Sequence, residues 1–230
     1  MQNLKVIFED NQIIVVEKPV NIPSQADKTG DIDMLTIIKA YLKEKYNKPG
    51  NVYLGLVHRL DRPVGGVMVF AKTSKSAGRL SNQVREKQFQ KTYLVIVNGK
   101  MEKQKGTLQD YLLKNEKNNM SKVVKEGTKN SKLAILDYEV LKYDEELNLS
   151  VLKINLHTGR HHQIRVQLSS RNHSIYGDQK YAGRGHGKQI ALWAYNLKFY
   201  HPISNELMEF EAIPEMIGSW AILKENCSIS

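Results

Sequence analysis

Regular alternation of apolar and polar residues is the feature that most constrains the fold of this 230-residue chain. Every second residue is apolar from Ala134 to Val140, and the same pattern returns from Leu152 to Leu156 and from Trp193 to Phe199. Strands with this period bury one face and leave the other polar, as in antiparallel sheets. The run from Glu206 to Phe210 is placed to form a hairpin with the strand before it. These segments predict a sheet that is mainly antiparallel.

The N-terminal part of the chain adds further strands. Leu4 to Pro23 is typical of a hairpin with its turn at Asp10-Asn11. Gly66 to Ala71 is apolar on both faces, as a central buried strand should be, and Gln90 to Val97 follows as the next strand.

Helical patterns are few and separate. Asp33 can cap a helix, and the apolar positions at helical spacing after it are Ile37, Ile38, Tyr41, Leu42 and Tyr46. A second helix is expected from about Ser74 to Lys87, with Ala77, Leu80 and Val84 on its inner side. A short helix is expected from about Arg160 to Ser170. We therefore predict an α+β fold, with a large mixed, mainly antiparallel central sheet flanked by a few helices and loops, in a single domain over residues 1–230.

The charge of the chain favours a polyanionic partner. Lys and Arg number 34 against 24 acidic residues, a formal net charge of +10, and phosphate contacts give affinity that depends little on sequence. A basic protein without such a partner is the alternative, and charge alone leaves the two level. No apolar run is long enough for a transmembrane span. The single cysteine, Cys227, rules out an internal disulfide, so we expect a cytoplasmic location.

Asp61 is the first candidate for chemistry. It lies between Arg59 and Arg62, with His58 three positions earlier, just before the strand Gly66 to Ala71. Cations this close favour the ionised carboxylate, which suits a nucleophile or base rather than an acid. An ordinary ion pair in a loop produces the same pattern more often. The residues around Asp61 therefore do not establish a catalytic role by themselves.

A basic turn with three histidines is the second candidate. Gly159 can open a turn after the strand, and the following residues fit a helix on which His161 and Arg165 lie one turn apart. His157, His161 and His162 invite a zinc interpretation, but no carboxylate or thiolate is interleaved as a ligand, so we expect no metal. Anchoring of phosphate, or positioning of a carboxylate, fits so basic a turn better.

Other segments carry weaker signals. A tyrosine such as Tyr93, near the start of a strand, usually packs in the sheet, whereas a functional one would stack on a base and transfer a proton. Lys100 to Asn130 is rich in Lys, Asn and Gly and predicts short strands or mobile hairpins with a basic surface. Gly183 to Gly187 predicts a flexible loop rather than a phosphate cradle. No dinucleotide-binding or P-loop glycine pattern is present, so we expect no nucleotide cofactor.

Taken in order, these segments resemble the RluA family of pseudouridine synthases. The motifs that carry the resemblance are His58-Arg59-Leu60-Asp61 followed by Gly66 to Thr73, Lys91-Thr92-Tyr93, and Gly159 to Arg165. Further matches are Val15 to Pro19 with Ile22-Pro23, Gly177-Asp178 with Tyr181, and His201-Pro202. The resemblance covers nearly the whole chain. Residues 63–65, His161 and Trp193 depart from the family pattern, but none of these departures removes a residue to which chemistry is assigned.

The resemblance implies an isomerase of the pseudouridine synthase fold that needs no cofactor. Asp61 would attack the ribose of a target uridine, or take a proton from it, as the C1′–N1 bond breaks, and uracil would rejoin through C5. Arg165 would pair with Asp61, and Tyr93 would stack on uracil and help to remove the C5 proton. The residues expected to bind RNA or substrate are His58, Arg59, Arg62, Arg160, His162 and Gln163.

The partner implied by the resemblance is structured RNA, either ribosomal or transfer RNA, whose target base must leave its stack to be rearranged. The first family motif begins almost at once, so we expect a catalytic domain without an N-terminal S4 domain, acting as a monomer. Two alternatives stay open. One is an RNA-binding protein of the same fold without activity. The other is a hydrolase that releases uracil, which usually needs a second carboxylate that is not recognisable beside Asp61.

Overall fold

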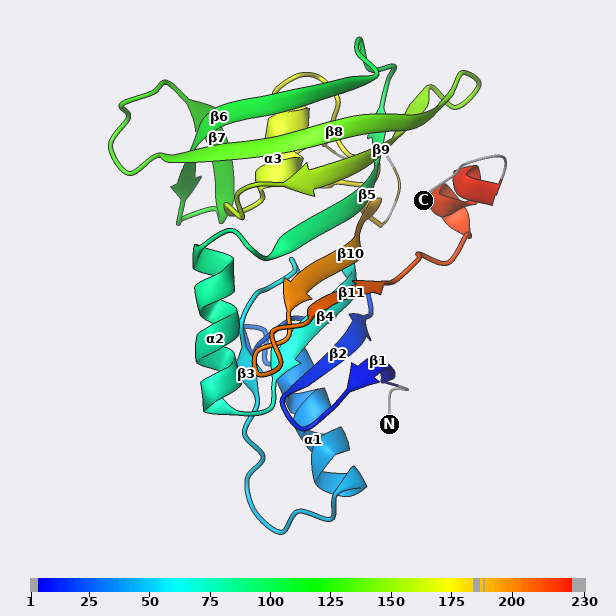
Figure 1. Cartoon of the computed structure of the whole chain (residues 1–230). Coiled ribbons are helices and arrows are strands. Elements are labelled where there is room, and N and C mark those ends of the chain that lie inside the picture. The colour runs from blue at the N-terminus through cyan, green and yellow to red at the C-terminus, as the bar shows by residue number, and fades with distance from the viewer. Residues whose placement is uncertain (1–3, 184–186, 188, 225–230) are drawn as a thin grey trace. The chain divides into compact units, whose positions relative to one another are not determined.

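The computed structural model of the chain describes residues 4–183, 187 and 189–224 (Figure 1). Cys227 and residues 184–186 of the glycine-rich loop lie outside this part. The chain divides into two compact units, the first made of Met1–Lys91 and Ala194–Ile213 and the second of Thr92–Trp193 and Pro214–Ser230. Within the described residues, no helix combines the length and the apolar character needed to cross a membrane.

The first unit is built mainly on antiparallel strand pairs. Its elements are β1 (Lys5–Glu9), β2 (Ile13–Lys18), α1 (Met34–Lys45), β3 (Gly55–Leu56), β4 (Gly65–Ala71), α2 (Ser74–Arg85), most of β10 (Leu192–Tyr200) and β11 (Leu207–Glu211). The strand order is β1-β2-β4-β10-β11, with β3 on the end of β4. All residues of β4 are buried, as expected for a central strand. Gly66 lets β4 approach β10, since a Cβ there would lie 2.1 Å from the carbonyl oxygen of Ala194.

The predicted helices of this unit are confirmed, with small differences. Asp33 caps α1 by accepting hydrogen bonds from the backbone N–H groups of Leu35 and Thr36. Ile38 and Leu42 are buried as predicted, but Tyr46 follows the last turn and is 45% exposed. In α2 the buried positions are Ser76, Leu80 and Gln83. The core between α2 and the sheet contains Val67, Val69, Ala71, Leu80, Phe89, Leu197 and Phe199.

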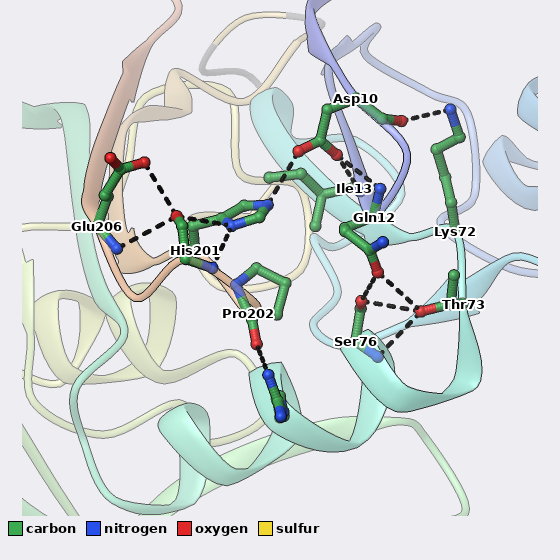
Figure 2. A network of polar contacts seen from close by, with 11 residues as sticks. Asp10, Gln12, Ile13, Lys72, Thr73, Ser76, His201, Pro202 and Glu206 are labelled. Atoms are coloured by element: carbon green, nitrogen blue, oxygen red, sulfur yellow. Dashed lines mark hydrogen bonds and ion pairs between the residues drawn. The ribbon is translucent and has the colours of Figure 1, made fainter.

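A polar network connects the β1–β2 turn to the β10–β11 turn (Figure 2). Nδ1 of His201 accepts the backbone N–H of Ser204 (3.0 Å), so the ring proton lies on Nε2 and is donated to Asp10 (2.9 Å). The other carboxylate oxygen of Asp10 accepts the N–H groups of Gln12 and Ile13, both at 2.7 Å. The side chain of Gln12 accepts the hydroxyl of Ser76, in the first turn of α2. The hairpin predicted for Leu4 to Pro23 is thus confirmed and fixed to its neighbours by side chains.

The second unit contains a series of antiparallel strands. Its elements are β5 (Gln90–Asn98), which starts in the first unit, β6 (Lys105–Asn115), β7 (Met120–Val124), β8 (Lys132–Asp144), β9 (Leu149–Leu156), α3 (Gln163–Ser169) and the 3-10 helix η1 (Gly218–Lys224). The order is β5-β9-β8-β6-β7. The prediction of short strands or mobile hairpins for Lys100 to Asn130 is partly wrong, because β6 has 11 residues and pairs with both β7 and β8.

The helix predicted from Arg160 begins later, at Gln163. His162 has a φ of 52°, in the left-handed region, which ends any helical path from the residues before it. The expectation that His161 and Arg165 share one helical face is therefore wrong, because His161 precedes the helix. Ile164 and Leu168 face inward as predicted, with 4% and 0% exposure. The α+β fold with mainly antiparallel strands is confirmed, and the single domain over residues 1–230 stays a prediction.

The His201 network predicts a measurable loss of stability. His201→Ala removes the bonds to Asp10 and Ser204 from a residue that is 9% exposed, and we expect the free energy of unfolding to fall by about 1–3 kcal/mol. Urea denaturation measures it. Ile203→Ala, at a 44% exposed position of the same turn, should change stability by less than about 0.5 kcal/mol. Equal effects of the two substitutions would contradict a stabilising role of the His201 hydrogen bonds.

Candidate active site

The loop between β3 and β4 presents Asp61 at the surface of the first unit. Leu60 and Val64 are buried on either side of it, with 6% and 2% exposure, while Asp61 is partly exposed. The hydroxyl of buried Ser24 donates to the carbonyl of Leu60 (2.9 Å) and accepts its N–H group (3.1 Å). The N–H group of Val64 donates to the carbonyl of Asp61 itself (2.9 Å). These bonds fix the backbone on both sides of the carboxylate.

Lys18 holds the same loop through a hydrogen bond to the loop backbone. Its side chain is 0% exposed, and its Nζ donates to the carbonyl oxygens of Pro19 (2.9 Å) and Arg62 (3.1 Å). Burial lowers the pKa of Lys18 to about 7, although the nearby charge of Asp61 acts in the opposite direction. An ammonium group at the end of β2 therefore holds the residue that follows Asp61.

The other predicted residues of this loop differ in their surroundings. His58 is 8% exposed, and its Nε2 accepts the N–H group of Val69 (3.1 Å), so Nδ1 carries the ring proton. Burial lowers the pKa of His58 to about 3, so the ring is neutral. Arg59 is exposed. Arg62 forms an ion pair with Asp31 and donates to the carbonyl of Asn21 (3.2 Å). Contact of these side chains with RNA stays a prediction.

Arg165 occupies a buried ion pair in the second unit. It is 4% exposed, and its Nε and Nη2 donate to the two carboxylate oxygens of Asp178 at 2.8 and 2.6 Å. Asp178 is 1% exposed and also accepts the N–H groups of Lys180 and Tyr181. Gly177 precedes it with a φ of 74°, and a Cβ there would lie 2.0 Å from the carbonyl oxygen of Gln189. Only glycine lets the backbone at this position come so close to that of Gln189, and the turn formed there carries Asp178.

The predicted binding residues near Arg165 surround the start of α3. The side chain of Gln163 accepts the N–H group of Arg160 (3.0 Å) and donates to the carbonyl of Ile135 (3.0 Å). Arg160 is exposed, and its Nε donates to a backbone carbonyl of β8. His162 is 8% exposed, and its Nδ1 lies 2.9 Å from the hydroxyl of Tyr181. Four predicted site residues of this unit thus lie on one turn and helix.

Tyr93 lies on β5, opposite Ile154 of β9. It is 7% exposed, which fits a tyrosine packed in the sheet as well as one that lines a site. Asp61 and Tyr93 belong to different units. The pairing of Arg165 with Asp61, and the stacking of Tyr93 on uracil, therefore stay predictions.

Sequence reasoning gave no role to Lys18, Ser24, Asp178 and Tyr181, although three of the four stand in motifs that carry the resemblance. The signals were the lysine in Val15 to Pro19 and the Gly177-Asp178 pair with Tyr181. Among the described residues, no group of three or more His, Cys, Asp or Glu side chains could hold a metal ion.

Comparison with known proteins identifies the family. The family model for RNA pseudouridylate synthase matches residues 12–170, a segment that contains Asp61, Tyr93 and Arg165. An uncharacterized RNA pseudouridine synthase of Aquifex aeolicus is 34% identical, over 90% of this chain and 68% of its own length. The ribosomal large subunit pseudouridine synthase C of Haemophilus influenzae is 29% identical, over 90% of this chain and 64% of its own length.

A solved structure has the same fold. The human RNA pseudouridylate synthase domain containing 4 superposes with a TM-score of 0.76 at 20% identity, covering 92% of this chain and 89% of that one. The chain therefore belongs to the RNA pseudouridylate synthase family. The predicted enzyme class, an isomerase that forms pseudouridine in RNA, is confirmed.

The buried ammonium of Lys18 predicts a pH-dependent stability. Its pKa is about 7 in the folded protein and near 10.5 in the unfolded chain, so the unfolded chain binds more protons between these values. The contribution of Lys18 to the free energy of unfolding is therefore constant below this window and rises with pH across it. Lys18→Met removes this titration. The free energy of unfolding of the wild type minus that of the variant should therefore increase as pH rises through the window.

Urea denaturation at a series of pH values measures this difference. Lys39→Met, at an exposed position of α1, is the control and should differ from wild type by a constant amount. A constant difference for Lys18→Met as well would show that Lys18 does not titrate in this window.

Proposed function

We propose that this enzyme isomerises specific uridines of structured RNA, ribosomal or transfer RNA, with Asp61 as the catalytic carboxylate. The observation that carries the proposal is the setting of Asp61. Asp61 is partly exposed, while the backbone on either side is held by the buried Ser24 and Lys18. A fixed, accessible carboxylate is what a nucleophile or base requires. Its place within the family-matched segment favours this role over an ordinary ion pair.

The proposed reaction conserves all atoms. Asp61 attacks the ribose of the flipped uridine, or takes a proton from it, and the C1′–N1 bond breaks. The freed uracil turns and C5 bonds to C1′, which frees Asp61 or is followed by return of the ribose proton. The proton lost from C5 is balanced by one gained at N1. No oxidant, reductant or group donor is required. The cost of unstacking the base, a few kcal/mol, must come from contacts with the RNA.

Arg165 and Tyr93 are the proposed partners of Asp61. Arg165 keeps the carboxylate ionised and oriented, because an opposite charge at close range favours the charged form. Its own orientation is set by the bidentate pair with Asp178. Tyr93 stacks on uracil and helps to remove the C5 proton. The bonds of Gln163 to Arg160 and Ile135 hold the turn before α3, which supports a positioning role for this residue beside the proposed RNA contacts of Arg160 and His162.

RNA contact by residues 100–130, the β6–β7 hairpin with its flanking segments, is supported by their charge. These residues include eight lysines, all exposed, against four acidic residues. The hairpin contacts the residues around Arg165, since Ser121 of β7 bonds to both His161 and Tyr181. Ribosomal RNA is a candidate substrate because one relative is named for the large ribosomal subunit. The enzyme is expected to act in the cytoplasm as a monomer.

Asp61→Asn is expected to abolish pseudouridine formation and to leave folding and RNA affinity unchanged. The carboxamide has nearly the same shape, but it has no charge and is neither a nucleophile nor a base of useful strength. Purified protein is incubated with ribosomal and with transfer RNA, and pseudouridine is mapped by chemical sequencing. Asp27→Asn changes an exposed carboxylate of the same unit and should keep wild-type activity.

The same experiment separates the alternatives. Wild-type activity of Asp61→Asn would exclude the mechanism. RNA binding without pseudouridine on any cellular RNA would favour the inactive RNA-binding protein, and free uracil would favour the hydrolase. Modification of only one RNA class would identify the substrate.

Removing charge from the hairpin should weaken RNA binding in a salt-dependent way. Affinity falls as salt rises, so the slope of log affinity against log salt is negative. In the triple variant Lys117→Gln, Lys122→Gln and Lys125→Gln, the magnitude of this slope is expected to decrease by about 0.7–0.9 for each lost phosphate contact. Filter binding at several salt concentrations measures this slope. The double variant Lys39→Gln and Lys43→Gln, on α1 of the other unit, should change it less per charge. Equal changes per charge would indicate non-specific binding.

A further inference from the structure

Tyr181 connects Arg165 to the edge strand β7. We propose that Tyr181 is a positioning residue for Arg165, with its ring supporting the guanidinium and its hydroxyl fixing the ring in place. This inference rests on the proposed role of Arg165 in the reaction. All the contacts involved lie within the second unit.

The central carbon of the Arg165 guanidinium lies over the aromatic ring of Tyr181. The Cζ atom of Arg165 is 5.2 Å from the ring centroid of Tyr181, which is within the range of a cation–π interaction. Because Arg165 is only 4% exposed, water screens this attraction little, and such contacts are strongest when desolvated. Tyr181 therefore contacts the guanidinium through its ring, whereas Asp178 accepts hydrogen bonds from Nε and Nη2.

The ion pair and the ring contact act on the same group. The two bonds to Asp178 define the direction of Nε and Nη2, and the ring of Tyr181 occupies the space beside the guanidinium carbon. Both contacts come from one turn, because Asp178 accepts the N–H group of Tyr181. The N–H group of Ala182 also donates to the carbonyl of Asp178 (2.8 Å). One short turn thus supplies both constraints on Arg165.

The hydroxyl of Tyr181 is bonded on two sides. It accepts the N–H group of Ser121 in β7 (2.8 Å) and lies 2.9 Å from Nδ1 of His162. Whether the hydroxyl or Nδ1 donates depends on the tautomer of His162. His162 stands at the left-handed position just before α3. The hydroxyl therefore ties the ring to the strand on one side and to the start of the Arg165 helix on the other.

A purely structural role is the competing explanation. Tyr181 also packs against Leu112, Ala134 and Val166, so it could stabilise the unit without any effect on the reaction. The two roles differ in what they change. A positioning residue affects kcat and the environment of Arg165 in the folded protein, whereas a structural residue affects stability alone.

The test compares Tyr181→Phe, which keeps the ring, with Tyr181→Leu, which loses ring and hydroxyl. We expect kcat for pseudouridine formation to fall about fivefold in Tyr181→Phe and about a hundredfold in Tyr181→Leu, with KM unchanged. Tyr143→Phe removes a hydroxyl that bonds Asn148 elsewhere in this unit and should keep the wild-type kcat. A kcat of Tyr181→Leu within twofold of wild type would overturn the proposal.

A second measurement does not depend on activity. In proton–nitrogen NMR spectra, the ring current of Tyr181 should shift the Arg165 side-chain signals. The shift should persist in Tyr181→Phe and vanish in Tyr181→Leu. Unchanged signals in Tyr181→Leu would refute the ring contact. If Tyr181→Leu does not fold, Tyr181→Phe decides: wild-type kcat would refute the role of the hydroxyl, and ordinary Arg165 shifts in the wild type would refute that of the ring.

The two proposals fail in different ways. A wild-type protein that forms no pseudouridine on any RNA would remove the proposed function, while the NMR spectra would still test the support of Arg165. Pseudouridine formation that is insensitive to both Tyr181 substitutions would remove only the present inference.

Discussion

The candidate site depends on buried polar groups that hold short irregular segments. The loop of Asp61 has no regular secondary structure, so its backbone needs partners from elsewhere, and the hydroxyl of Ser24 and the ammonium of Lys18 provide them. Arg165 is held in the same manner by Asp178, whose carboxylate is almost fully buried. Removing one partner of such a group leaves the other desolvated, which is costly. The same bonds that orient the candidate catalytic groups therefore contribute to stability.

Much of the fold could be predicted because local patterns and tertiary structure agree. Strands with alternating residues form where expected, and Asp33 caps α1 as its position suggested. The prediction was wrong where one residue adopts an unusual backbone conformation. Nothing in the run after Gly159 indicates that His162 is left-handed, and the partner of its ring, Tyr181, lies 19 residues further along the chain. The length of β6 was missed because its pairing with β8 is not a local property.

The candidate site was predictable only through the resemblance, for the same physical reason. Ser24 reaches Leu60 over a separation of 36 residues, and Lys18 reaches Arg62 over 44. No periodicity connects such positions. The local pattern around Asp61 suggested that Arg62 favours the ionised form of this carboxylate, and the structure shows that its guanidinium also forms an ion pair with Asp31. Charges that are neighbours in sequence can thus serve different partners, which is why spacing alone did not establish a role for Asp61.

The position of Tyr181 suggests how RNA binding and chemistry are related in the second unit. Ser121 of β7 donates its N–H group to Tyr181, and the next residue, Lys122, is one of the exposed lysines of the proposed RNA-binding hairpin. RNA bound by the hairpin would therefore hold the strand that fixes the ring beneath Arg165. Binding energy from parts of a substrate that do not react raises kcat when it orients the reacting groups. Under the two proposals, a phosphate contact on β7 contributes to affinity and also keeps Arg165 in its reactive orientation.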